Sequence, residues 1–186
     1  MMQKAFKNMR LVQNQARLFS YNYQSASHPR VWLDVSRDGQ RVGRLNFELY
    51  ETHTPALAEN FTAFATGQAQ GHRSYVGTSL HSSVPGQGFQ AGTFEGENQG
   101  SNNERLADEN LELRHHKRGI LTLPNDGPNS NGSTFMVTYD QANYLNGYQN
   151  AIGELVEGDD VLAQIEASSD RYGALSGEWT ISAAGH

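Results

Sequence analysis

Residues 127–138 have the sequence Gly-Pro-Asn-Ser-Asn-Gly-Ser-Thr-Phe-Met-Val-Thr. The first seven are all turn formers, because glycine, proline, asparagine and serine adopt or stabilise the backbone angles of turns. Thr134 to Thr138 then form a short apolar and β-branched run, and Gly119 to Leu123 form another before the turn formers. Short runs bounded by turn residues are typical of strands. The stretch therefore predicts two strands joined by a surface loop.

Further short strands are predicted on both sides of this stretch. Arg37-Asp38-Gly39-Gln40 supplies a hairpin turn, and residues 71–110 mix brief apolar runs with glycine, serine and asparagine, which predicts short strands joined by loops. The inward side chains of the second strand should be Val42, Leu45 or Phe47, and Leu49. The additional strands are expected at Val31 to Val35, Val42 to Tyr50, Ala151 to Leu155 and Trp179 to Ala183.

Two helices are expected among the strands. Thr54 before Pro55 starts a helix over residues 55–66, and Gly67 ends it. Asp159 is expected to cap a second short helix, in which Val161, Leu162 and Ile165 mark the apolar face. Strands at short intervals with two helices predict a mainly β fold, a closed barrel capped at its ends.

Composition limits the architecture to one main domain. The chain has 186 residues, of which 37% are hydrophobic, and 19 glycines against 5 prolines, which suits a turn-rich β fold. No apolar run approaches the roughly 20 residues that cross a bilayer, so we expect no transmembrane segment. The absence of cysteine excludes disulfides, thiol catalysis and thiolate metal sites.

The charges are unevenly distributed. Lys4, Lys7, Arg10, Arg17 and Arg30 lie in the first 30 residues, and the first acidic residue is Asp34. The remainder carries nine basic against 20 acidic residues, so direct nucleic-acid binding through the main domain is disfavoured. We therefore divide the chain into an N-terminal basic segment, residues 1–29, and a main domain, residues 30–186.

The N-terminal segment is predicted to form an amphipathic helical extension. Basic residues lie opposite one apolar stripe, which consists of Ala5, Met9, Val12, Ala16 and Phe19. Acid-free, arginine-containing amphipathic character at an N-terminus is typical of a mitochondrial transit peptide, and Arg17-Leu18-Phe19-Ser20 resembles a matrix-protease cleavage pattern. The alternative is a docking helix that stays attached and is covered by a partner.

Three local patterns are weak indications of chemistry. Gly86 to Ala91 matches a dinucleotide fingerprint, but the residues that follow do not predict a helix. His81 lies next to Ser82 and Ser83, which could suggest a hydrolase, but the sequence has no Gly-x-Ser-x-Gly nucleophile elbow. His115 and His116 have no further ligand at metal spacing and are expected to form a solvated loop pair. We expect no metal and no cofactor.

Several blocks of the chain together resemble one family. In order they are Gly43-Arg44-Leu45 to Phe47-Glu48-Leu49-Tyr50, Pro55 to Ala58-Glu59-Asn60-Phe61, His81 to Pro85-Gly86, Asp108-Glu109-Asn110, Gly119-Ile120-Leu121, and Gly127 to Ser133. Their order and spacing resemble the cyclophilin family of peptidyl-prolyl isomerases over roughly residues 30 to 185. The resemblance implies an eight-stranded antiparallel β-barrel closed by two α-helices, with a peptide groove on its outer wall.

The same resemblance places the groove residues. In the family, a catalytic arginine follows the motif histidine, which corresponds to His81. The resemblance places Ser82 at the position of that arginine. It places Gln87 and Gly88 at the positions of the family's apolar residues after Pro-Gly. Another groove phenylalanine corresponds to Met136, a glutamine to Thr134, the groove histidine to Gln149 and the usual tryptophan to Tyr144. The family's residues persist at Gln90, Asn125 and Leu145.

Three functions follow as expectations. The first is a catalytically inactive, structural accessory subunit of a large mitochondrial complex, such as a respiratory-chain complex or the mitochondrial ribosome, in the matrix or on the matrix side of the inner membrane. The second is a mitochondrial peptidyl-prolyl isomerase that assists folding. The third is a module that binds proline-containing peptides without turnover.

Overall fold

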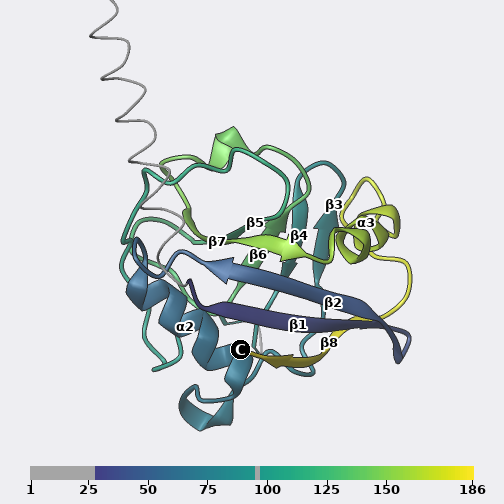
Figure 1. Ribbon diagram of the computed structural model, residues 1–186, viewed down its shortest axis with the longest axis horizontal. Coiled ribbons are helices and arrows are strands. Elements are labelled where there is room, and N and C mark those ends of the chain that lie inside the picture. Colours follow the sequence, from purple (N-terminus) through teal and green to yellow (C-terminus); the bar gives the residue numbers. More distant parts are fainter. Residues whose placement is uncertain (1–27, 95–96) are drawn as a thin grey trace, which may run out of the picture.

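The computed structural model describes residues 28–94 and 97–186, and the N-terminal segment of residues 1–29, in which the amphipathic helix is predicted, falls almost wholly outside them. Eight strands form one antiparallel sheet in the order β3-β4-β6-β5-β7-β2-β1-β8 (Figure 1). The strands are β1 (Arg30–Arg37), β2 (Gln40–Leu49), β3 (Ser82–Val84), β4 (Gly88–Ala91), β5 (Ile120–Leu123), β6 (Phe135–Thr138), β7 (Asn150–Glu157) and β8 (Trp179–Gly185). The helices are α2 (Pro55–Thr66) and α3 (Asp159–Ala167), with 3₁₀ turns η1 (Gln70–His72) and η2 (Asn143–Leu145). The predicted fold class, mainly β with two α-helices, is confirmed.

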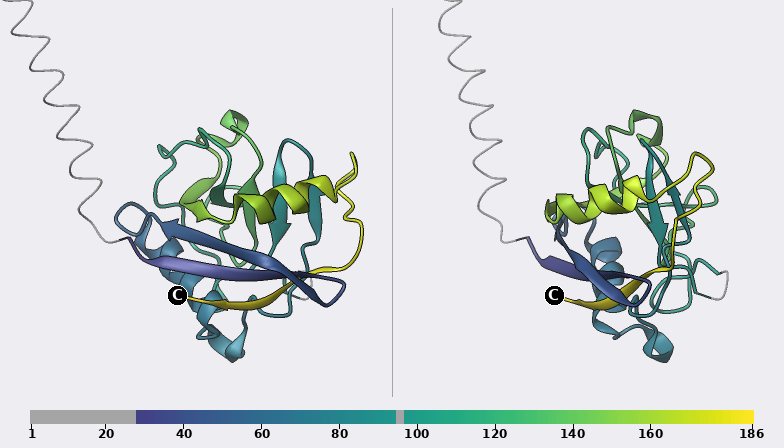
Figure 2. Two further views of the ribbon diagram at one scale, coloured as in Figure 1. Left: turned by 45° about the vertical axis from the view of Figure 1, so that its right-hand side comes forward. Right: turned by 90° about the vertical axis from the view of Figure 1, so that its right-hand side faces the viewer.

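The sheet curls until its two outer strands approach each other. Ser79, just before β3, forms a bridge with Thr180 in β8. The amide of Leu80 donates to the carbonyl of Trp179 at 2.9 Å. Figure 2 shows the resulting curvature from two sides, with α2 and α3 at different ends of the curled sheet. Among the described residues, no helix has the length and apolarity needed to cross a membrane.

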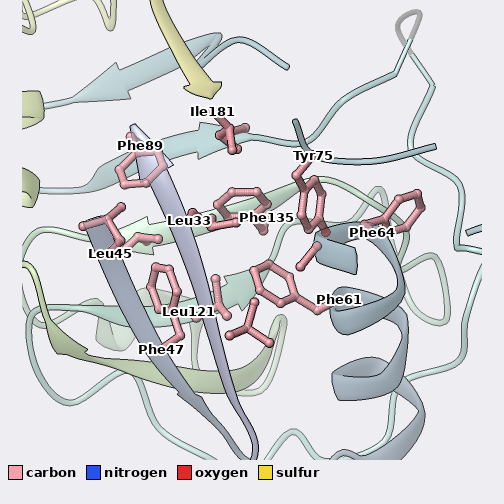
Figure 3. Close-up of a cluster of buried hydrophobic side chains, with 14 of the residues drawn as sticks. Leu33, Leu45, Phe47, Phe61, Phe64, Tyr75, Phe89, Leu121, Phe135 and Ile181 are labelled. Carbon is pink, nitrogen blue, oxygen red and sulfur yellow. The ribbon is translucent and has the colours of Figure 1, made fainter. Parts of the chain in front are cut away.

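An aromatic cluster fills the interior. Phe61 from α2 packs edge-on against Phe135 of β6 with ring centroids 5.3 Å apart, and Tyr75 lies 5.0 Å from the same ring (Figure 3). All three side chains are fully buried. The Tyr75 hydroxyl donates to the carbonyl of Ser133 at 2.9 Å, so its only polar group is satisfied. Burial also raises the pKa of Tyr75 well above its ordinary value.

The inward face of β2 carries the predicted side chains. Leu45, Phe47 and Leu49 are all fully buried, and Val42 is partly buried and packs against the same core. Val35 pairs with Gly43 and the next residue of β1 pairs with Arg41, so the register shifts at Val42. This bulge interrupts the two-residue alternation, so Val42 packs on the same side as Leu45.

The helix ends are only partly as predicted. Gly67 ends α2 in the left-handed conformation at φ 70°, as expected. Asp159 does not cap α3, because the cap position is Gly158 at φ 102° and Asp159 is the first helical residue. The Asp159 carboxylate instead accepts a bond from Arg118 Nε at 2.6 Å.

A distant carboxylate, not Thr54, satisfies the start of α2. The Thr54 hydroxyl donates to the carbonyl of Tyr50 at 3.2 Å. The Glu109 carboxylate accepts bonds from the amides of Ala56 at 3.1 Å and Leu57 at 2.8 Å. A negative charge at a helix N-terminus also interacts favourably with the helix dipole.

Asp108, next to this capping residue, joins three segments. Its Oδ1 accepts bonds from the side-chain amides of Asn131 at 2.8 Å and Asn150 at 2.7 Å, and its Oδ2 accepts from the amide of Asn129 at 2.9 Å. Burial opposes ionisation of Asp108, but these three hydrogen bonds outweigh it and lower the pKa of the carboxyl. The loop between β4 and β5, which contains Asp108, is thereby joined to the loop after β5 and to the start of β7.

We predict that Asp108→Asn lowers the free energy of unfolding at pH 7 by roughly 1–3 kcal/mol, because an amide nitrogen must then face one of the donors. Because the folded-state pKa of Asp108 is depressed, its stabilisation is present above the unfolded-state value and is lost as pH falls through the folded-state value. Urea unfolding across this acidic range should therefore show a smaller pH dependence in the variant. Asp160→Asn, at an exposed site on α3, should change stability by no more than about 0.5 kcal/mol. Equal effects of the two substitutions would contradict this role for Asp108.

Candidate functional site

The polar half of the predicted groove surrounds a cavity of about 440 Å³. Four of the predicted residues line it, namely His81, Gln90, Asn125 and Thr134. Its other lining residues are Thr93, Glu97, Asn98, Gln99, Arg105, Pro124 and Asp126. The sequence therefore identified four of the eleven residues that line this cavity, and two of them, Gln90 and Asn125, carry side-chain amides that can bond a peptide backbone.

Hydrogen bonds fix the amide and hydroxyl groups of this cavity. Thr134 Oγ1 lies 3.0 Å from Thr93 Oγ1, and the Thr134 amide donates to Asn98 Oδ1 at 2.8 Å. Asn125 Nδ2 donates to the carbonyl of Tyr148 at 2.9 Å. Asn125 therefore also connects the cavity to the turn that contains η2.

Arg105 is a cavity residue that the sequence did not indicate. Its Nη1 donates to Asp126 Oδ2 and to the carbonyl of Ser130, both at 3.0 Å. The nearest sequence context, Asn102 to Glu104, predicts only a surface loop, so no local signal marks this arginine. Its positive charge is already paired within the site.

Ser82 lies on β3, opposite Gln90 on β4, but does not line the cavity. Ser82 is partly buried. It lies close to the loop after α3, because a Cβ atom added to Gly173 in that loop would be 3.2 Å from Ser82 Oγ. The neighbouring Ser83 points the other way and is fully buried, with its hydroxyl bonded to those of Tyr139 and Ser169. Burial raises the pKa of Tyr139 to about 12, so this hydroxyl cluster is structural at neutral pH.

The apolar half of the predicted groove is closed by its own side chains. Met136 and Leu145 pack with Ala142 in a small cluster and are only 6% and 8% exposed. A Cβ on Gly88 would lie 3.1 Å from Met136 Cγ and 2.5 Å from the carbonyl oxygen of Val137. The Met136 side chain thus occupies space that a longer residue at position 88 would need. Neither Met136 nor Leu145 lines the polar cavity.

The other predicted residues of this half are less buried, although the amide of Gln149 donates to the carbonyl of Leu145 at 3.1 Å. Gln87 is exposed in the β3–β4 turn, and Tyr144 is 57% exposed on η2. Gln149 is half-buried, and its Oε1 is buried without a hydrogen-bond partner in the described part of the chain. Gln87 and Tyr144 therefore contribute exposed surface and not a buried apolar seat.

A model of the cyclophilin-type peptidyl-prolyl cis-trans isomerases, described as "Cyclophilin type peptidyl-prolyl cis-trans isomerase/CLD", matches residues 32–185. The chain belongs to the cyclophilin family. The match covers all but the first two residues of the eight-stranded sheet, and both helices.

The surroundings of His81 in this cyclophilin groove disfavour its cationic form. Partial burial lowers the pKa of His81 below its ordinary value, and a hydrogen bond with Gln90 only partly opposes this effect. The neutral ring is therefore favoured. Within residues 28–94 and 97–186, no three metal-ligating side chains come together either.

His115 corrects the expectation of a solvated histidine pair. His116 is exposed, but His115 is fully buried, with Nδ1 3.1 Å from Asn146 Oδ1 and Nε2 2.9 Å from Thr122 Oγ1. Burial lowers the pKa of His115. The neutral ring joins β5 to the turn that contains η2, so it positions one side of the groove.

We predict that Gly88→Ala lowers the free energy of unfolding by about 1–3 kcal/mol, because β4 must move away from the Val137 carbonyl. Denaturant unfolding measures the change. Gln87→Ala, the exposed neighbour, serves as the control and should have little effect. A Gly88→Ala protein as stable as the parent would show that the groove has room for a side chain there.

Proposed function

We propose that this cyclophilin has little or no isomerase activity and serves as a structural accessory subunit of a large mitochondrial assembly, such as a respiratory-chain complex or the mitochondrial ribosome. The observation that carries the proposal is Ser82, which stands where the family resemblance places the catalytic arginine. The fold itself is intact, so the difference lies in the groove.

The chemistry explains why one residue matters. Rotation of a prolyl amide must overcome a barrier of about 20 kcal/mol from lost resonance. A cationic donor lowers this barrier only if it binds the twisted state more strongly than the planar one. A serine hydroxyl is neutral and much shorter than a guanidinium, so it offers neither the charge nor the reach.

Neighbouring groups do not replace the missing cation. Arg105 lines the cavity, but its guanidinium bonds Asp126 and the Ser130 carbonyl. Partial burial lowers the pKa of His81, which favours its neutral form. The site also lacks an apolar seat for the proline ring, since Gln87 is exposed and Met136 packs over Gly88. Binding and turnover are therefore both expected to be weakened.

The assembly role is supported by the charge pattern of the chain. The first 29 residues carry four basic and no acidic residues, as a matrix-targeting segment requires, whereas the main domain is strongly acidic. We propose a location in the mitochondrial matrix or on the matrix side of the inner membrane. The protein partners would be other subunits of the assembly.

A second candidate function is a mitochondrial isomerase that assists folding. Gln90 and Asn125 favour it, because both line the cavity and present amides to a bound chain. The same two residues suit a module that binds proline-containing peptides without turnover. Measured turnover separates these functions from one another.

We predict that the unmodified domain isomerises an X-Pro peptide roughly 10² to 10³ times more slowly than an active cyclophilin assayed beside it. Ser82→Arg should raise kcat/KM at least about tenfold, because one charge-assisted donor is restored. A protease-coupled assay measures both rates. Ser82→Ala is the matched control and should leave the low rate unchanged. Wild-type turnover equal to that of the active enzyme would contradict the proposal.

A separate prediction concerns the assembly. Tagged protein expressed in its own cells should migrate in native gels with a large mitochondrial particle, and the Ser82→Arg variant should do the same, because the contacts do not require catalysis. Migration as a free monomer in mitochondrial extracts, at low as well as high salt, would contradict the subunit role. This result is independent of the isomerase assay.

A further inference from the structure

A second cavity, of about 680 Å³, lies along the outer side of α2, away from the groove. One wall is the helix, and the opposite wall is the segment 101–106. The lining residues are Pro29, Glu51, Pro55, Ala56, Ala58, Glu59, Asn60, Thr62, Ala63, Gln68, Ser101, Asn102 and Leu106. Nothing in the proposed groove chemistry uses this cavity.

The cavity combines a small apolar floor with an acidic rim. Ala56, Ala63 and Leu106 contribute apolar surface, and none carries a long side chain that fills the space. Glu51 and Glu59 are exposed at the rim, and neither forms an ion pair with another described residue. The lining contains no lysine, arginine or histidine. The chemistry that fits this surface is an apolar stripe flanked by positive charge.

The chain itself carries such a segment, and it enters at the cavity. Pro29 lines the cavity, so residues 1–27 are joined to the described part of the chain at that wall. These residues include four basic and no acidic side chains. The apolar stripe is formed by Ala5, Met9, Val12, Ala16 and Phe19.

We propose that the N-terminal segment folds back and docks in the α2 cavity, with its apolar stripe on Ala56, Ala63 and Leu106 and its basic residues near Glu51 and Glu59. The stripe spans 15 residues, about 22 Å as a helix. It is therefore long enough to cover the roughly 14 Å of α2 between Pro55 and Ala63. Nine residues between Phe19 and Pro29 can span up to about 30 Å, which is enough for the reversal. Because the connection is covalent, the effective concentration reaches the millimolar range, so weak contacts suffice.

This docking does not depend on whether the groove is catalytic. It does require the segment to remain attached in the working protein. A retained segment then hides its apolar stripe against its own domain, and a partner that displaces it gains access to both the stripe and the acidic cavity. Docking in this way would couple assembly to release of the segment.

Because the chain has no cysteine, two introduced cysteines can form only one intramolecular disulfide, which allows a direct test. In the full chain, the pair Ala16→Cys and Ala63→Cys should form an intramolecular disulfide under mild oxidation at least about tenfold faster than the pair Ala16→Cys and Ala163→Cys, because docking concentrates the thiols. Ala163 is exposed on α3 and Ala63 is only partly exposed, so solvent accessibility alone would make the control thiol the more reactive one. Ala56→Cys in place of Ala63→Cys repeats the measurement at an exposed cavity position, in case the first substitution disturbs the helix.

Charge reversal tests the rim. Glu59→Lys should slow the disulfide several-fold at low salt, and Glu178→Lys, an exposed glutamate outside the cavity, should not. Equal rates for the cavity and control pairs would overturn the proposal, and disulfide-linked dimers in place of the intramolecular product would assign the cavity to a second copy. Intact mass of the protein isolated from mitochondria provides the last check, since a chain that begins after Phe19 has lost the docking segment and also overturns the proposal.

Discussion

The carboxylate of Asp108 holds together the parts of this molecule that form its groove. It accepts hydrogen bonds from Asn131 and Asn129 in the loop after β5, and from Asn150 at the start of β7. The next residue, Glu109, satisfies the first amides of α2. One short acidic segment therefore fixes a loop, a strand and a helix, and the cavity residues on either side of the loop inherit their positions from it.

The groove shows that framework and chemistry can change separately. The bonds that place Asn125 and Thr134 do not involve Ser82, Gln87 or Gly88, so the polar cavity keeps its framework although these three positions differ from the family pattern. Met136 packs against Ala142 and Leu145 over Gly88, which turns an apolar seat into part of the core. A domain that needs only its shape tolerates such changes, whereas a catalyst depends on each of them.

The elements could be predicted from sequence because their determinants are local. Alternating residues defined the strands, and Pro55 and Gly67 marked the ends of α2. The bulge at Val42, the cap at Gly158 and the burial of His115 were not predictable, because each depends on a neighbour from a distant part of the chain. The site was also only partly predictable. The family blocks located His81, Gln90, Asn125 and Thr134. Nothing near Arg105 in the sequence indicates that it enters the cavity, because its place there depends on partners from a distant loop. The closing of the apolar half follows from contacts between β4 and β6, which no single segment encodes.

The central claim is that this groove does not ease the twist of a prolyl amide. Exchange NMR on an X-Pro peptide with the unmodified domain tests the claim directly. We expect the cis and trans peptide signals to show no exchange cross-peaks on the subsecond timescale. Cross-peaks of the intensity that an active cyclophilin produces at the same concentration would contradict the claim.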